Sequence, residues 1–203
     1  MNMEIIVGEV RKIFRAFNEH FYNNELTEPM IVVQTNGVKK STQGWCTVNK
    51  VWIGPDEQEE YELTICSEFL SDDFYNTCDT VAHEMVHLYN LMNGIKDVNA
   101  NGKTHNKSYK EQAENRGLIV EKDSKLGWAI TSLQDSTKTF VDSLDINKEA
   151  FTWKRVNITK PKATREPKPR FKYSCPDCGA KFTSSKELRA ICSECNVEFE
   201  LQD

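Results

Sequence analysis

The chain has 203 residues, of which 38% are hydrophobic and 28% charged, and its formal net charge is −5 at pH 7. This length and apolar content suffice for one substantial core and leave room for a small second domain. The longest aliphatic run covers only residues 30–33, and Glu4 interrupts the apolar residues near Met1. We therefore expect a protein that neither spans a membrane nor is secreted, located in the cytoplasm, the nucleoid or the nucleus.

The first part of the chain predicts a helix followed by strands. Apolar residues recur at intervals of three and four across residues 2–23, which indicates an amphipathic helix. Three β-rich runs follow, and turn-forming residues at 36–37 and 54–56 separate them. The runs cover residues 30–35, 45–53 and 61–66. We expect a small three-stranded antiparallel sheet packed on the first helix, and hence an α+β fold.

Residues 72–93 read as one helix that carries the pentapeptide His83-Glu84-Met85-Val86-His87, with Ser71 or Asp72 as its N-cap and Asn93-Gly94 at its end. Residues four apart share a helix face, so His83 and His87 can bind one Zn²⁺ while Glu84 reaches a water beside it. An apolar stripe from Phe74 to Met92 lies away from the histidines. One side of this helix is therefore expected to build the core, and the other to line a cleft of the zincin-like type.

A catalytic zinc needs a third protein ligand and one open position. His105 is the only histidine downstream of His87, and it lies just ahead of a short helix predicted at residues 108–116. A carboxylate of that helix, Glu111 or Glu114, is the alternative. The metzincin extension is excluded, because it requires Gly at position 90 and His at position 93, and both are Asn.

These residues define a hydrolytic mechanism as a hypothesis. Zinc held by His83, His87 and His105 would lower the pKa of a bound water, and Glu84 would act as general base and then pass the proton to the leaving amine. Tyr89 and Tyr109 are candidates to stabilise the oxyanion, with little to separate them.

Residues 118–159 are harder to interpret. Runs at 118–120 and 128–130 could form a hairpin around Lys125-Leu126-Gly127, and later apolar residues could add packing. Trp128 and Trp153 are expected to be core or lid residues rather than substrate contacts. No functional argument arises from this part of the chain.

Residues 160–172 have the composition of an extended linker, with three prolines, six basic residues and one acidic residue. The segment could be a solvated spacer or could contact the phosphate backbone of a nucleic acid. The candidate contacts are Lys160, Lys162, Arg165, Lys168, Arg170 and Lys172. We expect domains at 1–159 and 173–203 on either side of this linker.

Two C-x-x-C pairs occupy the end of the chain, joined by 13 residues. They comprise Cys175, Cys178, Cys192 and Cys195. Four thiolates close a tetrahedral zinc site with no open position, so this second zinc is expected to be structural. β-rich runs at 181–183, 189–191 and 197–201 favour a zinc ribbon, to which the metal supplies folding energy that about 31 residues lack.

Several short motifs together resemble the SprT-like metallopeptidase domain over about residues 10 to 130. They are Phe17-Asn18 with Phe21-Tyr22, Gly44-Trp45-Cys46, Leu63-Thr64-Ile65-Cys66, His83 to His87, and His105 with Tyr109. The chain departs from that pattern at Asn106, where a Gly is usual. The resemblance implies a zinc-dependent protease of the group that includes Spartan, which acts on DNA-bound proteins and removes DNA-protein crosslinks.

The predicted function is therefore a zinc metalloprotease with one catalytic and one structural Zn²⁺, a protein substrate, DNA as a partner and no membrane. Two other interpretations remain at this point. The chain could be a non-enzymatic adaptor whose ribbon binds nucleic acid or protein, or a zinc hydrolase that acts on a non-protein amide.

Overall fold

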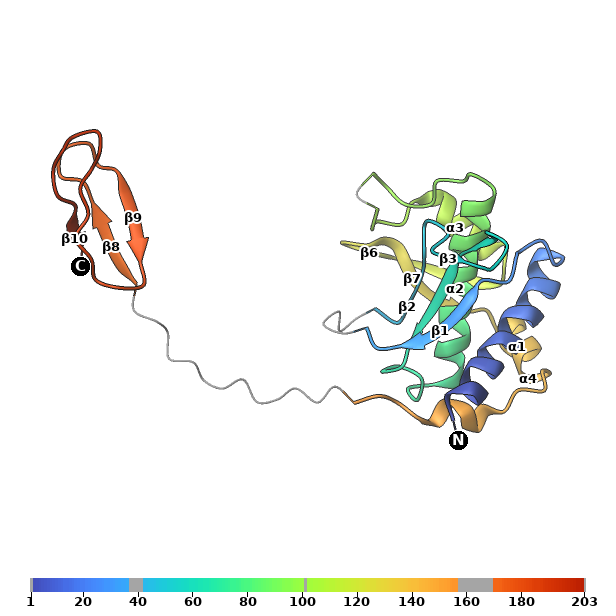
Figure 1. Ribbon diagram of the computed structural model, residues 1–203. Helices are drawn as coiled ribbons and strands as arrows, with labels where there is room; N and C mark the ends of the chain where they lie inside the picture. The colour runs from blue at the N-terminus through green and yellow to red at the C-terminus, as the bar shows by residue number, and fades with distance from the viewer. Residues whose placement is uncertain (1, 37–41, 101, 157–169, 203) are drawn as a thin grey trace. The chain divides into compact units, whose positions relative to one another are not determined.

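The computed structural model describes residues 2–36, 42–100, 102–156 and 170–202. The chain divides into two compact units, residues 1–157 and 158–203, and each unit is described by itself (Figure 1). Most of the predicted linker lies outside the described residues, and strand β8 of the second unit begins at Phe171. The predicted domain boundaries thus stay a prediction.

The first unit opens with helix α1, Met3–Tyr22. The Asn2 side chain caps it by accepting the backbone N–H of Ile5 at 3.1 Å, and Asn23 ends it in the left-handed conformation, with φ of 51°. The predicted apolar face is buried, and four of its side chains are wholly inaccessible: Val10, Ile13, Phe14 and Phe17. This face packs on α2 and on strand β1.

A three-stranded sheet covers the helices in the order β1-β5-β2, with β1 at Met30–Gln34, β2 at Gly44–Cys46 and β5 at Glu62–Cys66. The prediction of an antiparallel sheet was wrong for β1, which runs parallel to β5. The long connection between β1 and β5, which itself contains β2, makes the parallel pairing possible. Four residues of the central strand β5 are buried, which is why three of them are apolar, Leu63, Ile65 and Cys66, with Thr64 as the buried polar exception.

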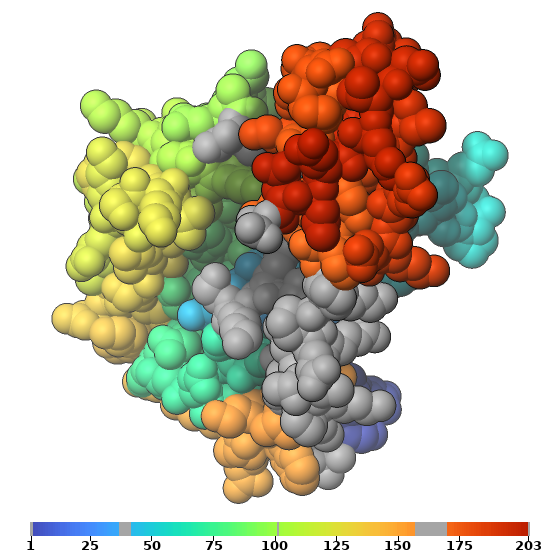
Figure 2. Space-filling view, turned by 90° about the vertical axis from the view of Figure 1, so that its left-hand side faces the viewer, coloured from blue at the N-terminus to red at the C-terminus, as the bar shows by residue number. Residues whose placement is uncertain are grey.

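The predicted strand 45–53 is two strands, because the chain bends at Val48 and Asn49. Strand β2 ends at Cys46, and β3, Trp52–Ile53, pairs with β4, Glu59–Glu60, in a separate hairpin. Val51 and Ile53 are exposed on this hairpin. Its atoms are the cyan ones in Figure 2.

Helix α2, Phe74–Met92, lies beside α1 and carries the pentapeptide (Figure 1). Its N-cap is Asp73, whose side chain accepts the backbone N–H of Tyr75 at 3.1 Å. The expected caps, Ser71 and Asp72, were wrong by one or two residues, because Asp72 belongs to a turn in which its N–H bonds to the carbonyl of Phe69. The middle of the predicted stripe is fully buried at Cys78, Val81, Met85 and Leu88.

The remainder of the first unit contains helix α3, a two-stranded hairpin, helix α4 and a short 3-10 helix. Their bounds are Lys107–Glu114 for α3, Leu118–Asp123 for β6, Gly127–Leu133 for β7, Asp135–Asp142 for α4 and Lys148–Thr152 for η1. The hairpin turns where residues 125–127 predicted it, and β7 packs on α2. Over the described residues the fold is thus α+β, with four α-helices, one short 3-10 helix and small sheets.

The second unit is a three-stranded antiparallel sheet in the order β10-β8-β9. The strands are β8, Phe171–Ser174, β9, Lys181–Ser184, and β10, Glu200–Gln202. The run predicted at 189–191 forms only a single bridge, between Ile191 and Glu198. In the described parts of the chain, none of the helices is both long and apolar enough to cross a bilayer.

Candidate metal centres and active site

Three histidines of the first unit converge on one point. Each of His83, His87 and His105 offers a ring nitrogen, and the three ligand atoms lie within 4.8 Å of one another. His83 and His87 come from one face of α2, whereas His105 comes from the loop before α3. The alternative ligand Glu114 instead lies 3.5 Å from Lys110, and neither it nor Glu111 joins this group of ligand atoms.

The backbone around His105 is held independently of its ring. The His105 N–H donates to the carbonyl of Leu126 at 2.8 Å, and its own carbonyl accepts the N–H of Trp128 at 3.1 Å. Gly127 lies between these two partners, with φ of 72°, and a Cβ there would fall 2.2 Å from the His105 oxygen. Only glycine therefore allows β7 to approach the histidine loop so closely.

Each histidine has an acceptor or hydroxyl at its Nδ1 atom. His87 Nδ1 lies 2.6 Å from Asp97 Oδ2, His105 Nδ1 lies 3.4 Å from the Leu126 carbonyl, and His83 Nδ1 lies 3.2 Å from Thr131 Oγ1. A carboxylate and a carbonyl can only accept, so His87 and His105 carry their protons on Nδ1. Their Nε2 lone pairs therefore face the centre of the cluster.

The spacing of these nitrogens fits a bound cation. His87 Nε2 and His105 Nε2 are 3.0 Å apart, although both carry lone pairs. Two lone pairs at that distance repel unless a positive charge lies between them, and tetrahedral zinc with bonds of about 2.0–2.1 Å places its ligand nitrogens about 3.3 Å apart. The donor set and the spacing thus suit zinc.

Burial keeps two of the rings neutral, as metal binding requires. Burial is the main cause that lowers the pKa of His83, and the pKa of His105 to about 4, with neighbouring imidazoles adding to it. For His87 burial acts in the same direction, but the hydrogen bond to Asp97 and the negative charges of Glu84 and Asp97 together outweigh it and raise the pKa. The same bond makes the His87 Nε2 atom a stronger donor to a metal.

Glu84 lies between the two helix histidines in sequence and is only 6% exposed. Burial raises the pKa of its carboxyl to about 7, against the opposing effects of His87 and of a hydrogen bond from the Cys46 backbone N–H. That N–H belongs to strand β2, so the sheet positions the carboxylate. A pKa near the working pH suits a general base.

Two adjoining cavities, of about 270 and 350 Å³, share Gly44, His83, Glu84 and His105 in their walls. The smaller cavity has apolar walls that include Val48, Leu91, Ile95 and Val98. The larger has mixed walls, which are polar at Thr42, Gln43, Asp79, Thr80 and Thr131 and apolar at Leu126, Ala129 and Ile130. A chain crossing this cleft would meet a mainly apolar side and a mixed side.

The two tyrosines considered for the oxyanion do not line these cavities. Tyr109 is fully buried beneath the three imidazoles, with ring centroids 4.5–4.9 Å apart, and its hydroxyl donates to the His83 carbonyl at 3.4 Å. Tyr89 packs against Arg116, at 3.7 Å, and against Tyr22. Tyr109 thus supports the histidines from below.

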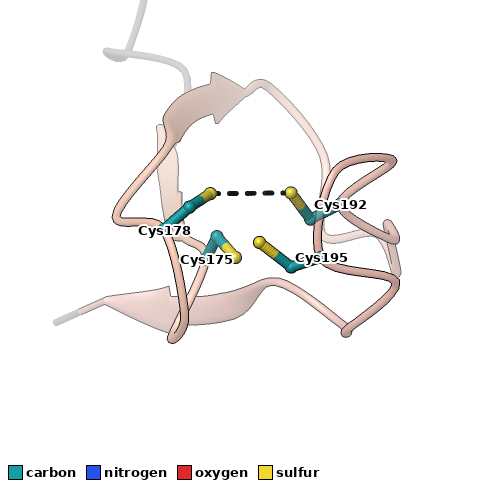
Figure 3. Close-up of side chains that lie close together, drawn as sticks. All are labelled: Cys175, Cys178, Cys192 and Cys195. Atoms are coloured by element: carbon teal, nitrogen blue, oxygen red, sulfur yellow. Dashed lines mark hydrogen bonds between the residues drawn. The ribbon is translucent and has the colours of Figure 1, made fainter.

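In the second unit, the four cysteine thiols face one another across the two knuckles (Figure 3). Cys178 and Cys192 Sγ atoms are 3.7 Å apart. The backbone N–H of Cys178, followed by that of Asp177, lowers the pKa of Cys175 to about 7, which favours the thiolate that a metal needs. This cluster suggests a zinc ribbon.

Of the predicted nucleic-acid contacts, Lys160, Lys162, Arg165 and Lys168 lie outside the described residues. Arg170 and Lys172 are exposed, the latter on β8. Asp79, Asp97, Leu126 and Thr131 were missed as site residues by the sequence reasoning. Asp79 is four residues before His83 on the same helix face, which is the one signal that could have drawn attention to it.

Comparison with known protein families matches residues 10–124 to the SprT-like family. Because the match covers more than half of the chain, the chain belongs to the SprT-like family, a membership consistent with a zinc-dependent protease-type function. No curated protein and no solved structure matches the chain.

The contact between Asp97 and His87 can be tested directly. We expect Asp97→Ala to weaken zinc binding at the histidine cluster by about tenfold to a hundredfold, because His87 loses the acceptor that orients it. Competition with a chelator measures this change. Asp135→Ala is the control, since the Asp135 side chain is 99% exposed on α4 and should leave zinc affinity unaltered; equal affinity in both variants would contradict the role of Asp97.

Proposed function

We propose that this chain is a zinc-dependent metalloprotease of zincin-like fold that cleaves proteins associated with DNA. The observation that carries the proteolytic part is the placement of the Glu84 carboxylate, buried beside three convergent imidazoles and open to two cavities. Zinc, when bound by His83, His87 and His105, supplies Lewis-acid chemistry to a water and to the carbonyl of a substrate amide.

The residues of the chain would then carry the proton. Glu84 accepts it from the attacking water and delivers it to the leaving amine, for which a pKa near 7 allows both steps. The hydrogen bond from the Cys46 N–H holds the Glu84 carboxylate in place while the proton moves. The cavity walls exclude bulk water and hold the substrate chain, with the apolar side taking an apolar side chain.

The DNA-associated part rests on the basic segment 160–172 and on the resemblance to the Spartan group. Six Lys/Arg residues with one acidic residue can neutralise DNA phosphates. The cysteine cluster, as a structural zinc site, would keep the ribbon folded at the end of that segment.

The test is cleavage of a DNA-binding protein by the full chain, with and without single-stranded DNA. We expect DNA to increase the rate severalfold, and added salt to remove the increase, because phosphate contacts are salt-sensitive. Replacing Lys160, Lys162, Arg165 and Lys168 with Gln should remove most of the stimulation, because four of the six basic residues are lost, while basal cleavage remains.

Other outcomes select other functions. If DNA does not change the rate of cleavage, the proposed association with DNA is wrong, and the proposed proteolytic activity stands. Zinc binding without hydrolysis of any protein would favour a non-enzymatic adaptor. Hydrolysis of a non-protein amide alone would favour a zinc hydrolase of such amides.

A further inference from the structure

Asp79 is a partly buried carboxylate whose position has no evident structural benefit. One of its oxygens accepts the hydroxyl proton of Thr131 at 2.9 Å, while the other, Oδ1, is buried and has no hydrogen-bond partner among the described residues. Burial raises the pKa of this carboxyl to about 6. A buried acid held by a single bond costs folding free energy, so a role outside folding is indicated.

Thr131 connects Asp79 to the histidine cluster. Its Oγ1 lies 3.2 Å from His83 Nδ1, and its hydroxyl proton points to Asp79. A hydroxyl has one proton, so while Asp79 accepts it, Thr131 can only accept from His83. The His83 proton is thereby placed on Nδ1.

Placing the proton on Nδ1 leaves Nε2 free for the metal. Without Asp79, the Thr131 hydroxyl could rotate and donate to His83, which would favour the tautomer with its proton on Nε2 and block that ligand. His83 is the one helix histidine whose Nδ1 meets a hydroxyl instead of a group that can only accept. It therefore depends on a second residue for its tautomer in a way that His87 does not.

We propose that Asp79 and Thr131 form a positioning relay from α2 through β7 that sets the tautomer and ring orientation of His83 for metal binding. The relay rests on the proposed zinc centre. It also gives the β6–β7 hairpin a function. Strand β7 carries Thr131, and the backbone of Leu126 and Trp128 in the same hairpin forms hydrogen bonds with the backbone of His105.

The test compares Thr131→Val, Thr131→Ser and Asp79→Ala by zinc affinity in the full chain. Valine keeps the shape of Thr131 but lacks the hydroxyl, whereas serine keeps the hydroxyl. We expect Thr131→Val and Asp79→Ala each to weaken zinc binding at the histidines about tenfold, and Thr131→Ser to retain it. The zinc at the four cysteines, reported by protection from alkylation, should not change.

Two further measurements separate positioning from folding. The double variant that combines Asp79→Ala with Thr131→Val should bind zinc no more weakly than Thr131→Val alone, because both changes break the same relay. In the presence of a chelator, Asp79→Ala should unfold at the same urea concentration as the parent chain or at a higher one, which a structural role would not produce.

Several results would overturn the relay. Unaltered zinc affinity in Asp79→Ala, equal loss in Thr131→Ser and Thr131→Val, or additive losses in the double variant would each do so. If the parent chain binds no zinc at its histidines, the proposed function itself fails. If the parent chain and its variants bind zinc with equal affinity, only the relay fails.

Discussion

Glu84→Gln should lower proteolysis about a hundredfold to ten-thousandfold while zinc content stays unchanged, because an amide of the same shape cannot accept the proton of the attacking water. Glutamine retains an oxygen that can accept the Cys46 N–H, so the cleft should keep its form. Removing a buried ionisable group should leave the free energy of unfolding equal or higher. Initial cleavage rates and metal analysis of the same preparation measure both effects.

The control for this variant is Glu121→Gln, an exposed glutamate on β6 that does not line either cavity. It should cleave at the parent rate. If Glu84→Gln cleaves as fast as Glu121→Gln, then Glu84 is not the general base, and the proteolytic proposal would need another group.

The helices could be predicted because local patterns determine them. The spacing of apolar residues places α1 within one residue of its observed ends, and the same periodicity identifies the buried side of α2. Strand direction is not a local property, since β1 and β5 pair across a long connection. The alternation of residues in each strand carries no information about whether its neighbour is parallel or antiparallel.

The candidate site divides in the same way. His83, Glu84 and His87 are brought together by one helical turn, so their spacing in sequence is sufficient. Asp97 reaches His87 from the following loop, and Thr131 reaches His83 from 48 residues away. Such partners depend on the path of the chain in three dimensions, and the sequence of residues 118–159 offered no chemical motif that would single out Thr131.

The cleft is assembled from both sides of α2. Strand β2 supplies the N–H that holds Glu84, and β7, together with Leu126 just before it, supplies the groups that hold His83 and His105. Gly44 lies at the first of these approaches, where a Cβ would fall 2.7 Å from the Thr64 carbonyl and from Thr80 Cγ2. The helix carries His83, Glu84 and His87, and the flanking strands supply hydrogen-bond partners for them.

The second large effect concerns His105. His105→Ala should reduce zinc from about two ions per chain to about one, because a catalytic site has three protein ligands and the ribbon site has its own four thiolates. The backbone bonds from His105 to Leu126 and Trp128 do not involve the ring, so the loop should keep its place. Added zinc should then no longer raise the melting temperature of the first unit, because a metal stabilises a folded protein only if the folded state binds it.

His20→Ala is the matched control for this loss, because His20 is a histidine of the same domain that lies outside the cluster. Its ring stacks on Phe140 with centroids 4.0 Å apart, so its removal should cost about 0.5–1.5 kcal/mol of stability and no zinc. Glu114→Gln tests the carboxylate alternative in the same assay. If Glu114→Gln loses a zinc ion and His105→Ala keeps both, the third ligand is Glu114 on α3. If His105→Ala loses an ion and Glu114→Gln keeps both, the three imidazoles bind the metal.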